Sequence, residues 1–217
     1  MTNQRIIQMS LFALSIFAMS TLIGWPLAIL LVLMIYFHEV GHQSAARFFG
    51  CKTGPIFMLP FLGGIALIDD KLSRFEHAIV SLWGPVHGLI FCLAAFAAFS
   101  FTGNPVFLTA MKFSAFINLF NLLPLGPLDG GQVLKSIAFS MHEHIGRVTM
   151  WLGIALSVFL AIKVGGAVMI AIAVLSLLDA GGEKVRTFRA EKMKWTEIGF
   201  ILIFWGLLFL ALCFILA

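Results

Sequence analysis

The stretch YFHEVGHQSA, residues 36–45, places His38, Glu39 and His42 within five positions of a long apolar run. On a helix, residues at i and i+4 share one face, so the two imidazoles can reach a single metal ion. Glu39 is adjacent to His38 and can approach a water molecule on that metal. A charged side chain at mid-bilayer costs about 2.5–3.5 kcal/mol on insertion scales. Three such groups in one apolar segment therefore indicate a functional site, in preference to a purely structural polar cluster.

The composition around this stretch is that of a membrane protein. Of the 217 residues, 61% are hydrophobic and 11% are charged, whereas a soluble domain has about 25% charged residues. We expect an all-α polytopic membrane protein with about six to seven transmembrane helices, forming a single integral membrane domain over residues 1–217. The expected spans are 6–24, 26–49, 76–101, 106–124, 148–163, 165–180 and 195–217.

The basic residues predict the orientation of these spans. If the N-terminus is inside, twelve of the 14 Lys and Arg residues lie on one side. Lys163 lies on the other side, and Lys112 lies within a span near its outer end. The positive-inside rule then places the N-terminus and the HEVGH segment toward the cytoplasm. The basic stretch EKVRTFRAEKMK, residues 183–194, is explained as a topology anchor that can touch anionic lipid, so a nucleic-acid partner is not expected.

The segment from Gly50 to Phe75 is hydrophobic but is interrupted by prolines and by Gly63-Gly64. Its two short β-prone runs predict a hairpin that dips into the cytoplasmic leaflet. Irregular backbone at that depth is tolerated where it is buried in protein or lines a wet cavity. A plain surface loop with apolar residues is the alternative.

A catalytic zinc site needs three protein ligands and a water molecule, so a third ligand is expected at a depth similar to that of the histidines. His38 lies about 18 Å from Pro26 at a rise of 1.5 Å per residue. Asp129 has the most suggestive setting, FNLLPLGPLDGG, because its prolines end a helix and its glycines allow a close turn. The residues expected to reach the depth of His38, and so the candidates for the third ligand, are Asp129, Asp179, His87 and Glu76.

H-E-x-x-H is the pattern of metalloprotease helices. Together with the later N-x-x-P-x-x-x-L-D-G, it resembles the site-2 protease family of intramembrane zinc proteases. The second pattern matches at Asn121, Pro124, Leu128, Asp129 and Gly130. The hairpin and the Gly84-Pro85 pair extend the likeness over residues 26–140, the expected catalytic core, and residues 141–217 add C-terminal helices.

The resemblance implies one Zn²⁺ per chain, bound by His38, His42 and Asp129. It implies that Glu39 is the general base and that Asn121 steadies the substrate or the oxyanion. The hairpin is expected to hold an unwound substrate as an added strand, and the candidate substrate-binding residues there are Gly63, Gly64 and Ile65.

Further polar groups have less specific roles. His87 departs from the family pattern and is either a residue of the second layer around the metal or a hydrogen-bonded histidine of the bundle. Asn118 shares a helix face with Asn121 and is expected to bond between helices. His142, Glu143 and His144 favour a solvated loop over a second metal site. The family often carries a PDZ or CBS domain, for which this chain has no room, and its last span has no assigned role.

The expected function is hydrolysis of peptide bonds within or near transmembrane segments of membrane proteins. The substrate would be a transmembrane protein or a leftover signal peptide, with an accessory or oligomeric partner where selection requires one. A compact chain of this kind fits a prokaryotic plasma membrane. The alternatives are a catalytically inactive metal-binding scaffold or an ion transporter, since acidic and His residues in spans also mark ion paths.

Overall fold

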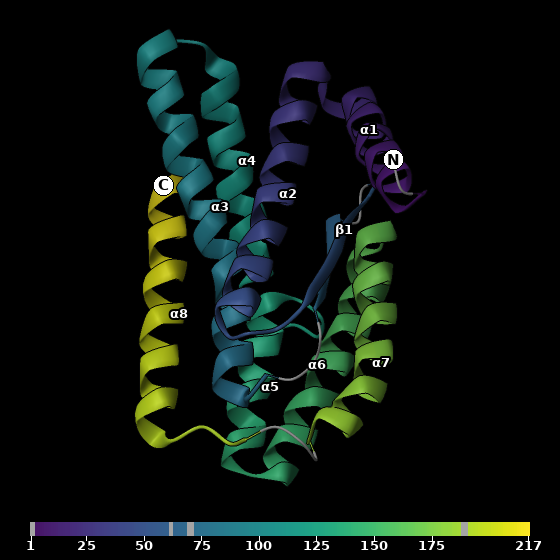
Figure 1. The fold of residues 1–217 in the computed structure, drawn as a ribbon, viewed down its shortest axis with the longest axis vertical. Coiled ribbons are helices and arrows are strands. Elements are labelled where there is room, and N and C mark those ends of the chain that lie inside the picture. Colours follow the sequence, from purple (N-terminus) through teal and green to yellow (C-terminus); the bar gives the residue numbers. More distant parts are fainter. Residues whose placement is uncertain (1–2, 61–62, 69–71, 188–190) are drawn as a thin grey trace.

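The computed structural model describes residues 3–60, 63–68, 72–187 and 191–217. Within them the chain forms eight helices and one two-stranded antiparallel hairpin (Figure 1). The elements in order are α1 Asn3–Ile23, α2 Trp25–Phe48, β1 Thr53–Leu59, β2 Gly63–Ile68, α3 Arg74–Thr102, α4 Pro105–Asn121, α5 Asp129–Met141, α6 Glu143–Val164, α7 Ala167–Thr187 and α8 Trp195–Leu216.

Helices long and apolar enough to cross a membrane number five among the described residues, namely α1, α2, α3, α6 and α8. The other two expected spans correspond to α4, which has 17 residues, and to α7, whose apolar part runs from Met169 to Leu178. The prediction of a helical membrane protein with a short hairpin is therefore confirmed. The organisation into one domain with a core at 26–140 stays a prediction.

Glycine and proline set several of the helix boundaries. Gly24, with φ of +79°, ends α1, and Pro26 lies in the first turn of α2. Gly103 closes α3 in the left-handed region, and Asn104 then caps α4 by accepting a hydrogen bond from the Val106 N–H. Gly165 and Gly166 both have positive φ, so the two apolar runs on either side are separate helices rather than one kinked span.

Helix α5 is not among the expected elements. Its 13 residues begin at Asp129, within a region where the sequence suggested a cytoplasmic loop. The helix is too short to resemble a span, and its glycine pair at the second and third positions lowers its helical propensity. Helix α5 places Asp129 at a helix N-terminus, where the backbone dipole favours a carboxylate.

The His142–His144 triplet has a structural role. The His142 side chain accepts a hydrogen bond from the His144 backbone N–H at 3.1 Å and so caps the N-terminus of α6. Glu143 pairs with Arg147 one turn later, and all of these side chains are exposed. The side chains are exposed, but Glu143 and His144 belong to the first turn of α6 and not to the loop expected there.

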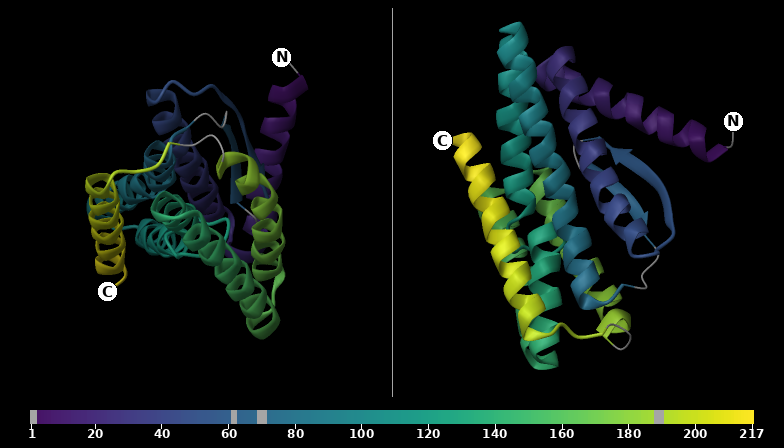
Figure 2. Two further views of the ribbon diagram at one scale, coloured as in Figure 1. Left: turned by 90° about the horizontal axis from the view of Figure 1, so that it is seen from below. Right: turned by 60° about the vertical axis from the view of Figure 1, so that its left-hand side comes forward.

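The helices form two groups around α2. Helices α3, α4 and α8 pack together on one side, and their shared core includes Leu82, Leu122 and Ile201. The hairpin lies between α2 and α1 on the other side, with α6 and α7 below α1 (Figures 1 and 2). Helix α1 is loosely attached, because Ser15 is its one buried residue. The hairpin therefore contacts α1 and α2, while the opposite side of α2 contacts α3 and α4.

Candidate metal centre

Three potential metal ligands converge between α2 and the start of α5. His38, His42 and Asp129 each offer a ligand atom, and these atoms lie within 4.8 Å of one another. The histidines are buried and the Asp129 side chain is 16% exposed. The sequence spacing placed the two imidazoles on one helix face, and the fold adds a carboxylate from a segment eighty-seven positions later.

Hydrogen bonds fix the same tautomer in both imidazoles. His38 Nδ1 donates to the Asn118 side-chain oxygen at 2.8 Å, and His42 Nδ1 donates to the Val80 carbonyl oxygen at 2.8 Å. A neutral imidazole with its proton on Nδ1 has a lone pair on Nε2. Both Nε2 atoms face Asp129, at 3.2 Å and 3.3 Å from its two carboxylate oxygens.

The distances between these atoms are compatible with a metal site. Charge-assisted N–H···O bonds are about 2.7–2.9 Å long, and both His–Asp separations are longer. A tetrahedral zinc ion with ligand distances of about 2.0–2.1 Å requires ligand atoms about 3.3–3.4 Å apart. The two Nε2 atoms are 3.1 Å apart, and each lies 3.2 or 3.3 Å from a different oxygen of Asp129, so the three side chains are spaced about as ligands of one such ion are.

The carboxylate supports the same conclusion. Asp129 Oδ2 is a buried oxygen with no hydrogen-bond partner. Lone pairs that face one another in a buried site repel, and an unpaired buried carboxylate oxygen carries a large desolvation cost. A cation among the three donors removes both penalties. Two imidazoles and a carboxylate are a ligand set that zinc accepts, with one position left for water.

Two of the other candidates for the third ligand, Glu76 and His87, make contacts elsewhere. Glu76 belongs to a capping box with Ser73 at the start of α3. His87 Nδ1 donates to the Trp83 carbonyl oxygen at 3.1 Å, and its ring packs on Phe37, with centroids 4.8 Å apart. The side chain of Asp179, like Asp69 and Asp70, lies outside the described residues. Of these candidates the structure brings Asp129 to the histidines.

The backbone of α3 lies directly against the metal ligands because glycines occupy the contact positions. A Cβ atom on Gly84 would overlap the His42 ring and approach His38 Nε2 to 2.8 Å. A Cβ atom on Gly88 would overlap the Asn118 amide. The Gly84-Pro85 pair noted in the sequence is thus explained in part by the space that two imidazoles need.

Asn118 orients His38 and is itself oriented by its own helix. Its amide nitrogen donates to the Ser114 carbonyl oxygen at 2.8 Å, which leaves its oxygen directed at His38 Nδ1. The expected interhelical hydrogen bond of Asn118 is therefore made to a metal ligand. The corresponding hydrogen bond from His42 to the Val80 carbonyl could not be predicted from the sequence, because every residue carries the same backbone carbonyl.

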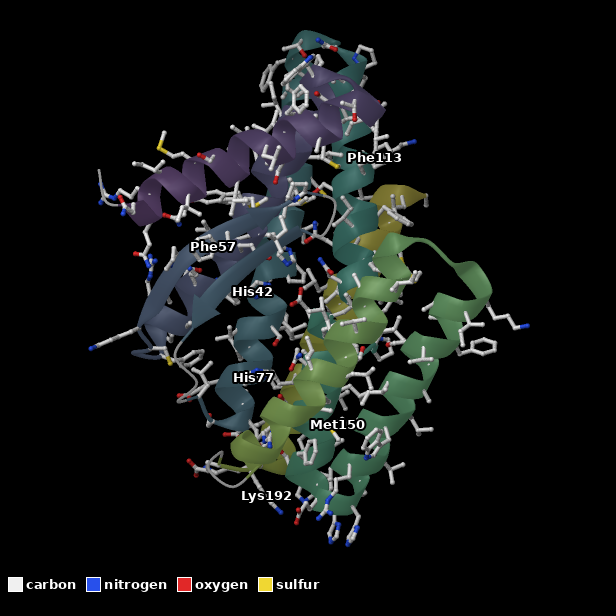
Figure 3. All side chains as sticks on the ribbon, turned by 90° about the vertical axis from the view of Figure 1, so that its right-hand side faces the viewer. His42, Phe57, His77, Phe113, Met150 and Lys192 are labelled. Atoms are coloured by element: carbon white, nitrogen blue, oxygen red, sulfur yellow. The ribbon has the colours of Figure 1, made fainter. Side chains whose placement is uncertain are left out.

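A cavity of about 660 Å³ opens beside the ligands. Glu39, Asn121, Gly63 and Gly64 line it together with residues of α1, α4 and α7. Figure 3 shows His42 close to the hairpin strands. Glu39 is not one of the three ligands, and Gly64 is so close to it that an added Cβ would overlap the glutamate side chain.

Ile65 lies in β2 opposite Phe57, and its side chain is outside the described part. The structure thus places all three hairpin candidates on β2. Gly63 and Gly64 open this strand rather than forming the turn before it.

Gly88→Ala should weaken zinc binding by about 10–100-fold, the usual effect of disturbing a partner of a metal ligand. The added methyl group would displace the Asn118 amide from His38. Competition with a chelating indicator in detergent measures the affinity. Gly199→Ala is the matched control, since a Cβ on Gly199 meets open space. Equal affinities of Gly88→Ala and wild type would contradict this role of Asn118.

The chain is similar to several curated proteins. It is 29% identical over 133 residues to a zinc metalloprotease of Methanocaldococcus jannaschii, covering 58% of this chain and 39% of that protein. It is 31% identical over 142 residues to the stage IV sporulation protein FB of Bacillus subtilis, covering 61% and 49%. A protein of Synechocystis sp., provisionally named as a zinc metalloprotease, is 27% identical over 196 residues, covering 78% and 52%. The chain thus spans about half the length of these relatives or less.

The profile of peptidase family M50 matches residues 26–112 and 100–162, which together include α2 to α5 and most of α6. This range contains the three convergent ligands, Glu39 and Asn121. The match extends over more than half of the chain, and the chain belongs to peptidase family M50, the site-2 protease family.

Proposed function

We propose that this chain is an intramembrane zinc metalloprotease that hydrolyses peptide bonds within or near transmembrane segments of membrane proteins. The observation that carries the proposal is the convergence of His38, His42 and Asp129 in a cavity that also contains Glu39. A carboxylate that lies beside the ligand set without belonging to it is suited to proton transfer.

We assign a separate role in the reaction to each of the polar side chains in the cavity. Zinc in such a site supplies a more acidic water molecule and a positive charge that polarises a carbonyl group. Glu39 accepts the proton from the attacking water and delivers it to the leaving amine. The Asn121 amide lines the same cavity, and it donates a hydrogen bond to the substrate carbonyl oxygen as negative charge develops there.

A helical substrate span must unwind before it can react, because its carbonyls are engaged in i→i−4 hydrogen bonds. The hairpin can accept the unwound segment on one edge. The edge of β1 is occupied, since Gln43 donates to the Gly54 carbonyl at 2.8 Å and Gln8 donates to the Ile56 carbonyl at 3.1 Å. The edge of β2 is therefore the one that we assign to the substrate.

The strand register identifies the groups on that edge. Ile56 opposes Ala66 and Met58 opposes Gly64. Because the Ile56 carbonyl is bonded from the side of α1, we infer that the 56–66 and 58–64 pairs are not hydrogen-bonded pairs. The backbone polar groups of Gly64 and Ala66 then point away from β1. Gly64 is also the residue against Glu39, so a strand added here would pass the general base.

An inactive metal-binding scaffold and an ion transporter would use the same ligands. Neither needs a carboxylate held against a strand beside the ligand set, whereas proteolysis does. We expect the substrate to be a single-span regulator or a remnant signal peptide, with recognition dominated by main-chain hydrogen bonds. Selection among substrates then depends on an accessory partner or on a prior cut.

Glu39→Gln should abolish cleavage and leave metal binding intact. Metal analysis in detergent should find one zinc per chain in both the wild type and the variant. Cleavage of a panel of single-span substrates should fall by at least about 10²-fold in the variant, the typical contribution of a general base. Glu143→Gln is the control, since Glu143 is exposed and pairs with Arg147. Undiminished cleavage by Glu39→Gln would remove this residue from the mechanism.

Ala66→Pro tests substrate pairing along β2. Proline removes the Ala66 N–H, and edge strands tolerate proline where that group faces away from the ladder. We expect a decrease in cleavage of about tenfold, the loss of one substrate hydrogen bond at about 1.5 kcal/mol. Zinc content should remain that of the wild type. If cleavage is unchanged while the variant binds zinc normally, the substrate does not pair at this position.

We place the N-terminus and the metal centre toward the cytoplasm of a prokaryotic plasma membrane. Single cysteines at exposed His144 and Lys163 mark opposite ends of α6, once Cys51, Cys92 and Cys213 have been replaced by alanine. A membrane-impermeant maleimide should label Lys163→Cys in intact cells, and His144→Cys only after the cells are permeabilised. The reverse pattern would invert the orientation.

A further inference from the structure

Helix α8 lies outside residues 26–162, the range matched by the family profile. It nevertheless packs along α3 and α4 (Figures 1 and 2). Trp205, in the middle of α8, donates a hydrogen bond from its indole Nε1 to the Leu122 carbonyl oxygen at 3.1 Å. This contact joins the last helix directly to the segment that leads into the metal centre.

The Leu122 carbonyl has no backbone N–H donor within its own helix. Leu122 is the C-terminal cap of α4, and the final carbonyls of a helix have no N–H four residues ahead in helical position. Pro124 follows and supplies no N–H at all. Leu122 itself is 1% exposed, so water cannot easily replace the missing donor, and a membrane protein must satisfy such a group internally. The Trp205 indole is the donor that meets this need.

The same oxygen also lies against the helix that carries the third ligand. A Cβ atom on Gly130 would overlap the Leu122 carbonyl, so the end of α4 and the start of α5 are in direct contact. Asp129 immediately precedes Gly130, and Asn121 immediately precedes Leu122. One peptide group therefore lies between the Trp205 indole and both of these cavity residues.

We propose that Trp205 is a positioning residue for the metal centre, which it stabilises by fixing the Leu122 carbonyl and, through it, the position of Asp129. This inference rests on the metal centre in the proposed function. It gives α8 a role in holding the third ligand in place, beyond its role as a membrane span.

The test compares zinc affinity with the stability of the metal-free protein. Trp205→Phe removes the indole N–H, and Trp205→3-benzothienylalanine replaces that N–H by sulfur while keeping the bicyclic shape. Both should raise the zinc dissociation constant by about tenfold, the lower end of the effect expected for outer partners of a metal ligand. Trp195→Phe, at a position on α8 that is 74% exposed, should match the wild type. Thermal unfolding is recorded in chelator.

A structural role alone would lower the unfolding temperature of the metal-free protein and leave zinc affinity unchanged. Wild-type zinc affinity in the 3-benzothienylalanine variant would therefore overturn the proposal, whatever the behaviour of Trp205→Phe. If the wild type binds zinc but cuts no substrate, the proposed proteolysis fails, while the comparison of affinities still decides the role of Trp205.

Discussion

The structure depends on the convergence of three lone-pair donors inside a membrane protein. The Nε2 atoms of His38 and His42 are 3.1 Å apart, and each lies 3.2 or 3.3 Å from one oxygen of Asp129, so their lone pairs face one another unless a cation or a proton lies between them. Each donor must therefore be held in place by its surroundings. Asn118 and the Val80 carbonyl hold the two imidazoles, and the contact of α4 with α5 holds the carboxylate. These supports come from α3, α4 and α5.

Close approach of the backbones makes these supports possible. The hydrophobic effect does not drive helices together within lipid, so their association depends on close packing and hydrogen bonds. Gly84 and Gly88 let α3 lie against the imidazoles and the Asn118 amide, and Gly130 lets α5 lie against the end of α4. Alanine at any of these positions would place a methyl group in space that a ligand, its partner or a carbonyl now occupies.

The sequence predicted the parts of the site that are side chains with recognisable spacing. His38 and His42 share a helix face, and the Pro-rich, Gly-rich setting of Asp129 singled it out among four candidates. The sequence could not reveal that the Val80 carbonyl orients His42, because every residue carries the same backbone group. It gave no sign of α5, whose start contains two glycines, nor of the bond from Trp205 to Leu122. His87 contacts Trp83 and Phe37, and its place in the layer around the metal stays a prediction.

The hairpin shows how the need to satisfy backbone polar groups can produce substrate specificity. Backbone at membrane depth has to be satisfied by protein or by water in a cavity, and unpaired strand edges attract other strands. Gln8 and Gln43 close the edge of β1 with side-chain amides, whereas β2 borders the cavity beside Glu39. An unwound substrate segment offers the same backbone groups whatever its side chains. Under the proposed function, such a site selects first for segments that unwind easily and only then for sequence.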